Sequence, residues 1–182
     1  MKVTALMPRE PVPTLKVPLT TGGEYDLKDS DAENFTMIVF YRGLHCPVCA
    51  MYLAEIERMS EEYAERGVKV IGVSSDTEER AQEMAVKAKL KNVKLGYGLD
   101  LQSARDWGLF ISTSRGKTSI GIEEPALFSE PGLFLVRADG TLFYGSTQTM
   151  PFARPPFKEL IGSIDFSLAN DYPARGEYTG EV

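Results

Sequence analysis

The chain has few of the residues that bind metals or staple small folds: in 182 residues there are two cysteines, one histidine and one tryptophan. Two cysteines cannot build a disulfide scaffold of the kind that holds small secreted domains together. Two thiols and one imidazole supply three soft ligands, one fewer than a closed tetrahedral zinc site needs. We therefore expect neither a metal nor a bound cofactor.

Basic residues are also scarce, with 20 lysines and arginines against 26 acidic residues, a net charge of −6 and a pI of about 5.0. Such a surface does not attract nucleic acid or an anionic membrane. Residues 1–9 lack the apolar segment of a secretory signal, and no later run approaches the length of a membrane span. We expect a cytoplasmic protein with no nucleic-acid or membrane partner.

What the chain does have is an ordinary globular composition, 43% hydrophobic and 25% charged. A chain of this length can bury a substantial core in one domain. We expect a single domain over residues 1–182, in which the polar residues 170–182 form a loose C-terminal tail.

Both cysteines and the histidine lie within residues 40–49, which read FYRGLHCPVC. An apolar run (35–40) ends there and an amphipathic stretch (51–66) begins just after, so the thiols lie where a strand ends and a helix starts. Two intervening residues allow Cys46 and Cys49 to form a disulfide across one helical turn. The free N–H groups and dipole of a helix N-terminus favour a thiolate. This arrangement suits a reversible dithiol.

Hydrophobic patterning and turn residues predict the remaining elements. Prolines exclude helix from the arm over residues 8–34, and residues 112–124 are polar and without periodicity, which predicts a mobile surface loop. Strands are predicted over residues 15–19, 24–27, 35–41, 68–74, 95–99, 131–137 and 141–145, and helices over 51–66, 75–90, 101–107 and 157–168. This order predicts an α/β fold with a mixed central sheet flanked by helices on both faces.

A strand, the Cys-Pro-Val-Cys of residues 46–49, a helix and a later strand opened by Pro131 together resemble the thioredoxin fold. The N-terminal arm and the insertion over residues 75–130 resemble its peroxiredoxin branch, the alkyl hydroperoxide reductase and thiol-specific antioxidant (AhpC/TSA) family. The similarity covers roughly residues 11–166. It is greatest to members whose active loop reads Arg-Gly-x-x-Cys-Pro-x-Cys, as residues 42–49 do here.

The resemblance implies a thioredoxin-like fold with a peroxiredoxin-type N-terminal extension and insertion. It also implies a peroxiredoxin-like antioxidant that reduces hydroperoxides through a Cys46–Cys49 disulfide, which a cellular dithiol donor then reduces. A homodimer is a further expectation from the family. Two alternatives remain open: a thioredoxin-like protein-disulfide reductase, and a redox-sensing or binding module without fast turnover. Two cysteines that merely pack as small hydrophobic residues would not need this spacing.

The chain departs from ordinary peroxiredoxins, which carry Pro-x-x-x-Thr-x-x-Cys and attack peroxide with the last cysteine. On this chain that cysteine is Cys49, the threonine is replaced by Cys46 and the proline by Arg42. Those enzymes also place an arginine beside the thiolate, near the start of a late strand. Pro131 lies in that neighbourhood here, and the sequence nominates no replacement.

The sequence does not decide which cysteine reacts first with the substrate. By analogy with thioredoxins, Cys46, at the first helical turn, is the attacking thiol and Cys49 is the resolving thiol. Peroxiredoxin logic reverses the roles: Cys49 becomes a sulfenic acid and Cys46 condenses with it.

Four neighbours are candidate supporting residues. His45 either assists a thiolate or points away, and Arg42 is either a cation near the thiolate or a solvated loop residue. Tyr41 either reaches the site with its hydroxyl or packs in the core. The resemblance makes Pro131 a cis proline that frees the preceding backbone to pair with a substrate, whereas a trans proline would merely start an edge strand.

Overall fold

A five-stranded mixed sheet lies at the centre of the structure, a computed structural model that describes residues 3–182. Its strand order is β5-β4-β3-β8-β9. The strands β3, β4 and β5 are mutually parallel, whereas β8 is antiparallel to β3 and to β9. Their bounds are β3 Phe35–Phe40, β4 Val68–Val73, β5 Lys94–Gly96, β8 Gly132–Arg137 and β9 Leu142–Thr147. The predicted mixed sheet is confirmed.

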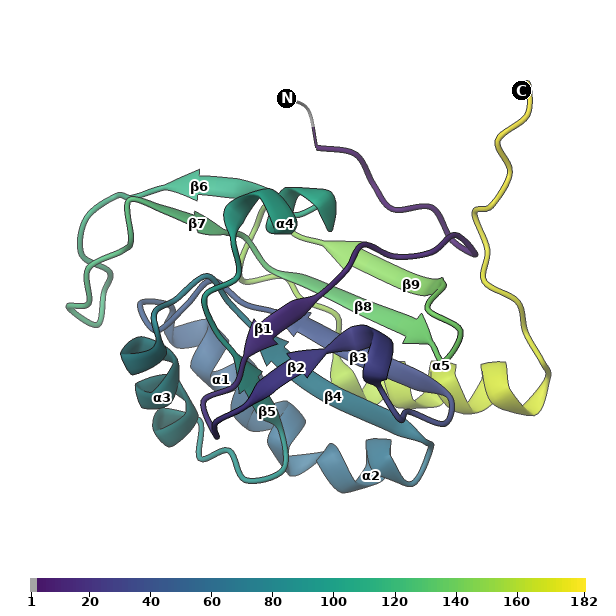
Figure 1. Cartoon of the computed structure of the whole chain (residues 1–182), viewed down its shortest axis with the longest axis horizontal. Coiled ribbons are helices and arrows are strands. Elements are labelled where there is room, and N and C mark those ends of the chain that lie inside the picture. The colour runs from purple at the N-terminus through teal and green to yellow at the C-terminus, as the bar shows by residue number, and fades with distance from the viewer. Residues whose placement is uncertain (1–2) are drawn as a thin grey trace.

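Two apolar layers cover the two faces of the sheet, with the β1–β2 hairpin in front of it and α1 behind it in Figure 1. All six residues of β3 are buried; Met37 and Val39 face one layer, while Ile38 and Phe40 face the other. One layer holds side chains of α1 (Pro47–Arg58), α2 (Ser60–Ala64), α3 (Glu78–Lys87) and α5 (Phe157–Ala169). The other holds those of α4 (Leu101–Asp106) and of β1 (Lys16–Pro18), which pairs with β2 (Glu24–Asp26), followed by the short η1 (Leu27–Asp29).

The helix predicted over residues 51–66 is two helices, because the backbone at Met59 leaves the helical region (φ −102°, ψ 2°). One face of the two helices is fully buried: Cys49, Leu53, Ile56 and Tyr63 have no exposed surface. Both helices therefore contribute buried side chains to the same apolar layer.

Residues 114–124 form the surface loop that their composition predicts, but residues 112–113 belong to a short strand that it does not predict. The strand β6 (Ile111–Thr113) pairs antiparallel with β7 (Leu127–Ser129), and the hairpin projects from the body of the molecule (Figure 1). A three-residue strand whose partner lies this far along the chain has no alternation that a sequence window can detect. Glu124 is buried against the loop that precedes α1, so the hairpin is attached to the candidate site.

The two termini lie on the same side of the molecule (Figure 1). Residues 170–182 form no helix or strand, but Arg9 Nε donates a 2.9 Å hydrogen bond to the carbonyl of Ala174, which is buried. Arg9 also pairs with Glu177 at 3.0 Å. Within residues 3–182, no helix is long and apolar enough to cross a membrane.

Candidate active site

The loop between β3 and α1 is anchored by Asp76, which follows β4. Asp76 Oδ2 accepts a 2.7 Å hydrogen bond from the Leu44 N–H, and Oδ1 accepts one of 3.0 Å from Arg80 Nε. Gly43 has φ 137°, and a Cβ there would lie 2.7 Å from Asp76 Oδ2, so only glycine fits. The N-cap of α3 is Thr77 rather than Asp76, which leaves the carboxylate free to hold this loop.

Both cysteines are free thiols in this structure, so their disulfide stays a prediction. Cys46 is the N-cap of α1, with Pro47 at the first helical position, and its Sγ accepts a 3.3 Å hydrogen bond from the Cys49 N–H. Cys46 keeps 2% of its surface exposed and Cys49 none. The predicted junction of strand and helix therefore buries both thiols, with Cys46 at the end of the helix and Cys49 one turn further along it.

The two thiols have opposite acidities. The hydrogen bond from the Cys49 thiol, together with the charge of Arg154 and the Cys49 N–H, lowers the pKa of Cys46 to about 6 although burial opposes this. Burial raises the pKa of Cys49, and the neighbouring Cys46 raises it further. Ionisation is thus favoured at Cys46 and opposed by burial at Cys49.

Arg154 is the arginine that the sequence did not nominate. Its Nη2 lies 3.1 Å from Cys49 Sγ and 3.7 Å from Cys46 Sγ. Its Nε donates to the Pro151 carbonyl at 2.7 Å, and the guanidinium lies 5.1 Å from the centroid of the Tyr52 ring. These contacts hold the cation over both sulfur atoms.

The segment between β9 and α5 that carries Arg154 is tied to the helices by two tyrosines. Tyr52 donates a 2.6 Å hydrogen bond to the Pro155 carbonyl and stacks on Phe157, with ring centroids 4.1 Å apart. Tyr63 donates to the Phe157 carbonyl at 2.7 Å. The topology could have pointed to this segment, since β9 runs in the same direction as β3 and both end at one edge of the sheet.

Arg42 is neither a solvated residue nor the direct partner of a thiol. It pairs with two buried carboxylates, Glu124 at 3.4 Å and Glu130 at 3.3 Å, and lies 4.7 Å from the centroid of the Phe128 ring. Its charge also helps to lower the pKa of Cys46, but less than Arg154 does. Its main contact is with the base of the β6–β7 hairpin.

His45 and Tyr41 are both fully buried. His45 Nδ1 lies 3.4 Å from Arg80 Nη2, and the ring packs edge-on against Phe128. Burial and the nearby charges of Arg42 and Arg80 lower the pKa of His45 to about 4, so the imidazole is neutral at pH 7. Burial also raises the pKa of Tyr41, which lies in the same apolar layer as Cys49. Neither side chain hydrogen-bonds to a thiol in the described part of the chain.

The prediction of a cis proline at Pro131 is wrong, because residues 3–182 contain no cis peptide bond. The backbone expected to be free for a substrate is also occupied: the Glu130 N–H donates a 2.7 Å hydrogen bond to the Phe110 carbonyl. The Pro131 carbonyl accepts from the Gln148 N–H at 3.0 Å. The insertion that precedes β8 thus fills the place where an extended peptide would pair.

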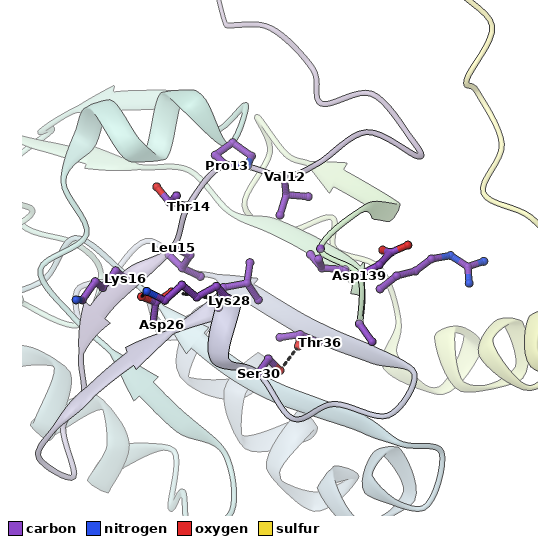
Figure 2. Close-up of a pocket in the computed structure, with 15 residues that line it drawn as sticks. Val12, Pro13, Thr14, Leu15, Lys16, Asp26, Lys28, Ser30, Thr36 and Asp139 are labelled. Carbon is purple, nitrogen blue, oxygen red and sulfur yellow. Dashed lines mark hydrogen bonds and ion pairs between the residues drawn. The ribbon is translucent and has the colours of Figure 1, made fainter.

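The described residues offer no metal site, and their cleft lies apart from the thiols. Residues 3–182 contain no group of three or more acidic, histidine or cysteine side chains placed to hold a metal ion. A cleft of about 520 Å³, shown in Figure 2, lies between the N-terminal arm, η1 and the β8–β9 turn. It reaches Thr36 near the start of β3, whereas the cysteines follow the end of that strand, so it lies apart from the thiols.

Comparison with known proteins identifies the family. The AhpC/TSA family profile matches residues 8–144. The chain belongs to the AhpC/TSA family. The matched range contains both cysteines and excludes Arg154.

Individual relatives of this AhpC/TSA chain are distant. A probable 1-Cys peroxiredoxin from Syntrichia ruralis is 35% identical over 63 residues, which is 35% of this chain and 29% of that protein. The fold is similar to AhpC of Mycobacterium tuberculosis (TM-score 0.72, 13% identity, 92% of this chain and 96% of that chain). It is also similar to a mutant of peroxiredoxin 6 of Arenicola marina (TM-score 0.70, 18% identity, 91% and 74%). These likenesses confirm the predicted thioredoxin-like fold.

Proposed function

We propose that this AhpC/TSA protein is a thiol-dependent oxidoreductase that reduces hydroperoxides through Cys46 and Cys49. The observation that carries the proposal is the Arg154 guanidinium within 3.1 Å and 3.7 Å of the two sulfur atoms, beside a Cys46 whose pKa is about 6. A thiolate is the nucleophile towards a peroxide, and a fixed cation stabilises it. We also propose the cytoplasm as its compartment, because both thiols must return to the reduced state.

In the first step the Cys46 thiolate attacks one peroxide oxygen. The O–O bond breaks, the alkoxide leaves and takes up a proton to become the alcohol, and Cys46 becomes a sulfenic acid. The Arg154 charge stabilises the negative charge that develops on the leaving oxygen.

In the second step the Cys49 sulfur attacks the Cys46 sulfur. A disulfide forms, the Cys49 proton is lost, and the hydroxide that leaves is protonated to water. Arg154 lies closer to Cys49 than to Cys46 and so stabilises the second thiolate as it forms. A cellular dithiol donor then reduces the disulfide by two exchange steps and is itself oxidised to a disulfide.

A protein-disulfide reductase is the second candidate, since an acidic Cys46 at the helix end, one turn before Cys49, also suits thiol–disulfide exchange. The hydrogen bond from the Glu130 N–H to the Phe110 carbonyl argues against it. A disulfide-bearing peptide would find no free backbone donor at this position.

The test uses separate Cys46→Ser and Cys49→Ser proteins, each treated with about one equivalent of hydrogen peroxide and a sulfenic-acid trap, and intact mass as the readout. We expect the adduct on the Cys49→Ser protein alone, because Cys46 carries the thiolate. An adduct on the Cys46→Ser protein alone would keep the peroxidase and reverse the roles. No reaction faster than that of a free thiol would overturn the function.

A further inference from the structure

Two buried carboxylates at the base of the β6–β7 hairpin take no part in the proposed reaction. Glu124 is 8% exposed and Glu130 is 5% exposed, and each lies within 3.4 Å of a nitrogen of the Arg42 guanidinium. Carboxylates are almost never buried to this extent unless they are paired. Arg42, Glu124 and Glu130, hereafter the Arg42 triad, thus join the hairpin to the loop before α1.

The hairpin fixes the position of each carboxylate. Glu124 Oε2 accepts a 2.7 Å hydrogen bond from the Arg115 N–H. Glu130 Oε1 accepts one of 2.6 Å from the Ser112 hydroxyl. The second oxygen of each carboxylate is the one that contacts Arg42. The two negative charges are therefore held by the hairpin, and Arg42 meets them there.

Stability alone does not explain the triad. Taking charges out of water is costly, and a buried ion pair stabilises a fold only when its geometry is excellent. Here the ionic contacts are 3.3 Å and 3.4 Å long, and within residues 3–182 neither Arg42 Nε nor Glu130 Oε2 has a hydrogen-bond partner of good geometry. Apolar side chains of similar size often give equal stability at such positions. The charges themselves therefore need an explanation.

The charge that the triad can influence is a thiolate on Cys46. Arg42 lies four residues before Cys46 in the same loop, and its positive charge contributes to the lowered pKa of that thiol. Two carboxylates oppose this single guanidinium, so the triad carries an excess negative charge. A nearby negative charge raises the pKa of a thiol. The hairpin therefore limits the effect that Arg42 alone would have.

The other charged groups around the loop do not supply this excess negative charge. Asp76 is balanced by Arg80 at 3.0 Å, and His45 is neutral at pH 7. Arg154 approaches the thiols from the segment before α5 and is a cation. The balance of charge on the hairpin side of the loop thus depends on the Arg42 triad.

We propose that the Arg42 triad sets the reactivity of Cys46 from the β6–β7 hairpin. Glu124 and Glu130 are positioning residues, which hold Arg42 and limit its effect on the thiolate. The inference rests on the proposed function, because it takes Cys46 as the reacting thiol. It adds no chemical step: the triad changes only the fraction of Cys46 that is ionised.

The test measures the pH dependence of iodoacetamide alkylation, with the alkylated cysteine identified by peptide mass. Glu124→Gln keeps the size and an acceptor oxygen but removes the charge, while Glu130 and the Phe128 ring still hold Arg42. We expect the Cys46 midpoint to fall by about half a pH unit, a roughly three-fold rise in the acid dissociation constant. The matched control is Glu123→Gln, which removes an adjacent but exposed carboxylate and should leave the midpoint unchanged.

The opposite change should follow from Arg42→Gln, which removes the cation and leaves both carboxylates. Its midpoint should rise by about one pH unit, a roughly ten-fold fall in the acid dissociation constant. An unchanged or lower midpoint in this variant would overturn the proposal. So would a Glu124→Gln midpoint that equals or exceeds that of Glu123→Gln.

Circular dichroism checks that each variant is folded, and Glu130→Gln replaces Glu124→Gln if the latter is not. Alkylation needs no peroxide, so this inference and the proposed function can fail separately. The expected shifts in a protein that reduces no peroxide would support the triad and refute the reaction. Peroxide reduction with unshifted midpoints would support the reaction and refute the triad.

Discussion

Arg154 lies in the segment before α5, and its guanidinium contacts the sulfur atoms of both cysteines. Its charge lowers the pKa of Cys46, and it also favours ionisation of Cys49 against the effect of burial. One cation can therefore serve the thiolate that attacks first and then the thiolate that resolves it. The acidity of this pair therefore depends on a residue outside the Cys-Pro-Val-Cys motif.

Replacing Arg154 with glutamine should raise the pKa of Cys46 above its value of about 6. At pH 7 the rate with hydrogen peroxide should fall roughly 10- to 100-fold. A smaller fraction of Cys46 would be thiolate, and no cation would stabilise the negative charge on the leaving oxygen. The pH dependence of iodoacetamide alkylation reports the pKa, and stopped-flow fluorescence reports the rate. Arg175→Gln, at an exposed arginine of the tail, is the control; equal rates for both variants would contradict this role.

The acidity of Cys46 also predicts how stability depends on pH. Cysteine has a pKa of about 8.5 in an unfolded chain, so between about pH 6 and 8.5 the unfolded state binds more protons. The free energy of unfolding of the reduced protein should therefore rise across this window, by on the order of 2 kcal/mol. This contribution of Cys46 should be complete above pH 8.5 and lost as the pH falls through 6. Urea unfolding at both pH values measures the rise, and Cys46→Ser should show none of it.

Among the elements, the loop from β3 to α1 depends on a contact between two loops. Asp76, after β4, holds the Leu44 N–H, and Gly43 leaves room for its carboxylate. The helix N-terminus that acidifies Cys46 is placed by this contact, because the N-cap follows the loop directly. A change at Gly43 should thus disturb both stability and thiol acidity.

We expect Gly43→Ala to lower the free energy of unfolding by about 3 kcal/mol, because the new methyl group meets Asp76 and the backbone has φ 137°. Gly98→Ala is the control, since Gly98 has φ 66° and nothing lies within 4 Å of an added Cβ. That change should cost about 1 kcal/mol from backbone strain alone. Chemical denaturation gives both values, and equal losses would refute the contact with Asp76.

At the scale of the whole molecule, the N-terminal arm, β9 and the tail form one side of the structure. The Arg9 N–H donates to the Leu142 carbonyl at 2.9 Å, and the Arg9 side chain binds Ala174 and Glu177. Two ends of the chain are therefore joined through one arginine. This junction lies away from the cysteines and should affect stability without affecting chemistry.

A chain that ends at Asn170 should lose about 1 to 2 kcal/mol of stability, because the buried Ala174 and the contacts of Arg9 are removed. A chain that ends at Arg175 keeps Ala174 and should lose less than half as much. Thermal unfolding measures both, and the alkylation midpoint of Cys46 should stay the same in each. A shift in that midpoint would mean that the tail reaches the active site.

Local sequence signals predicted most of the fold. The continuous apolar run of β3 and the Cys-Pro-Val-Cys motif each act within a few residues, and the structure contains both. The break at Met59 and the short strand β6 have no comparable local signal. They depend on how distant parts of the chain pack.

The candidate site likewise contains residues that a local motif predicts and residues that only the fold brings to it. Cys46 and Cys49 were found because their spacing is itself the signal. Arg154 and Asp76 were missed because each meets the motif only through the order and direction of strands. The wrong expectation at Pro131 came from the family, and the hydrogen bond between Glu130 and Phe110 shows that the insertion has changed that position.

The stretch that links β9 to α5 is anchored at few points and contributes one side chain to the thiols. Protein engineers could therefore exchange it as a cassette, tuning how fast the dithiol is oxidised while its two sulfur atoms stay in place. A genome survey that searches only for the Cys-Pro-x-Cys signature would not distinguish chains with this β9–α5 linker from chains without it. Comparing the linker as well as the signature would separate chains that place an arginine at the thiols from chains that do not.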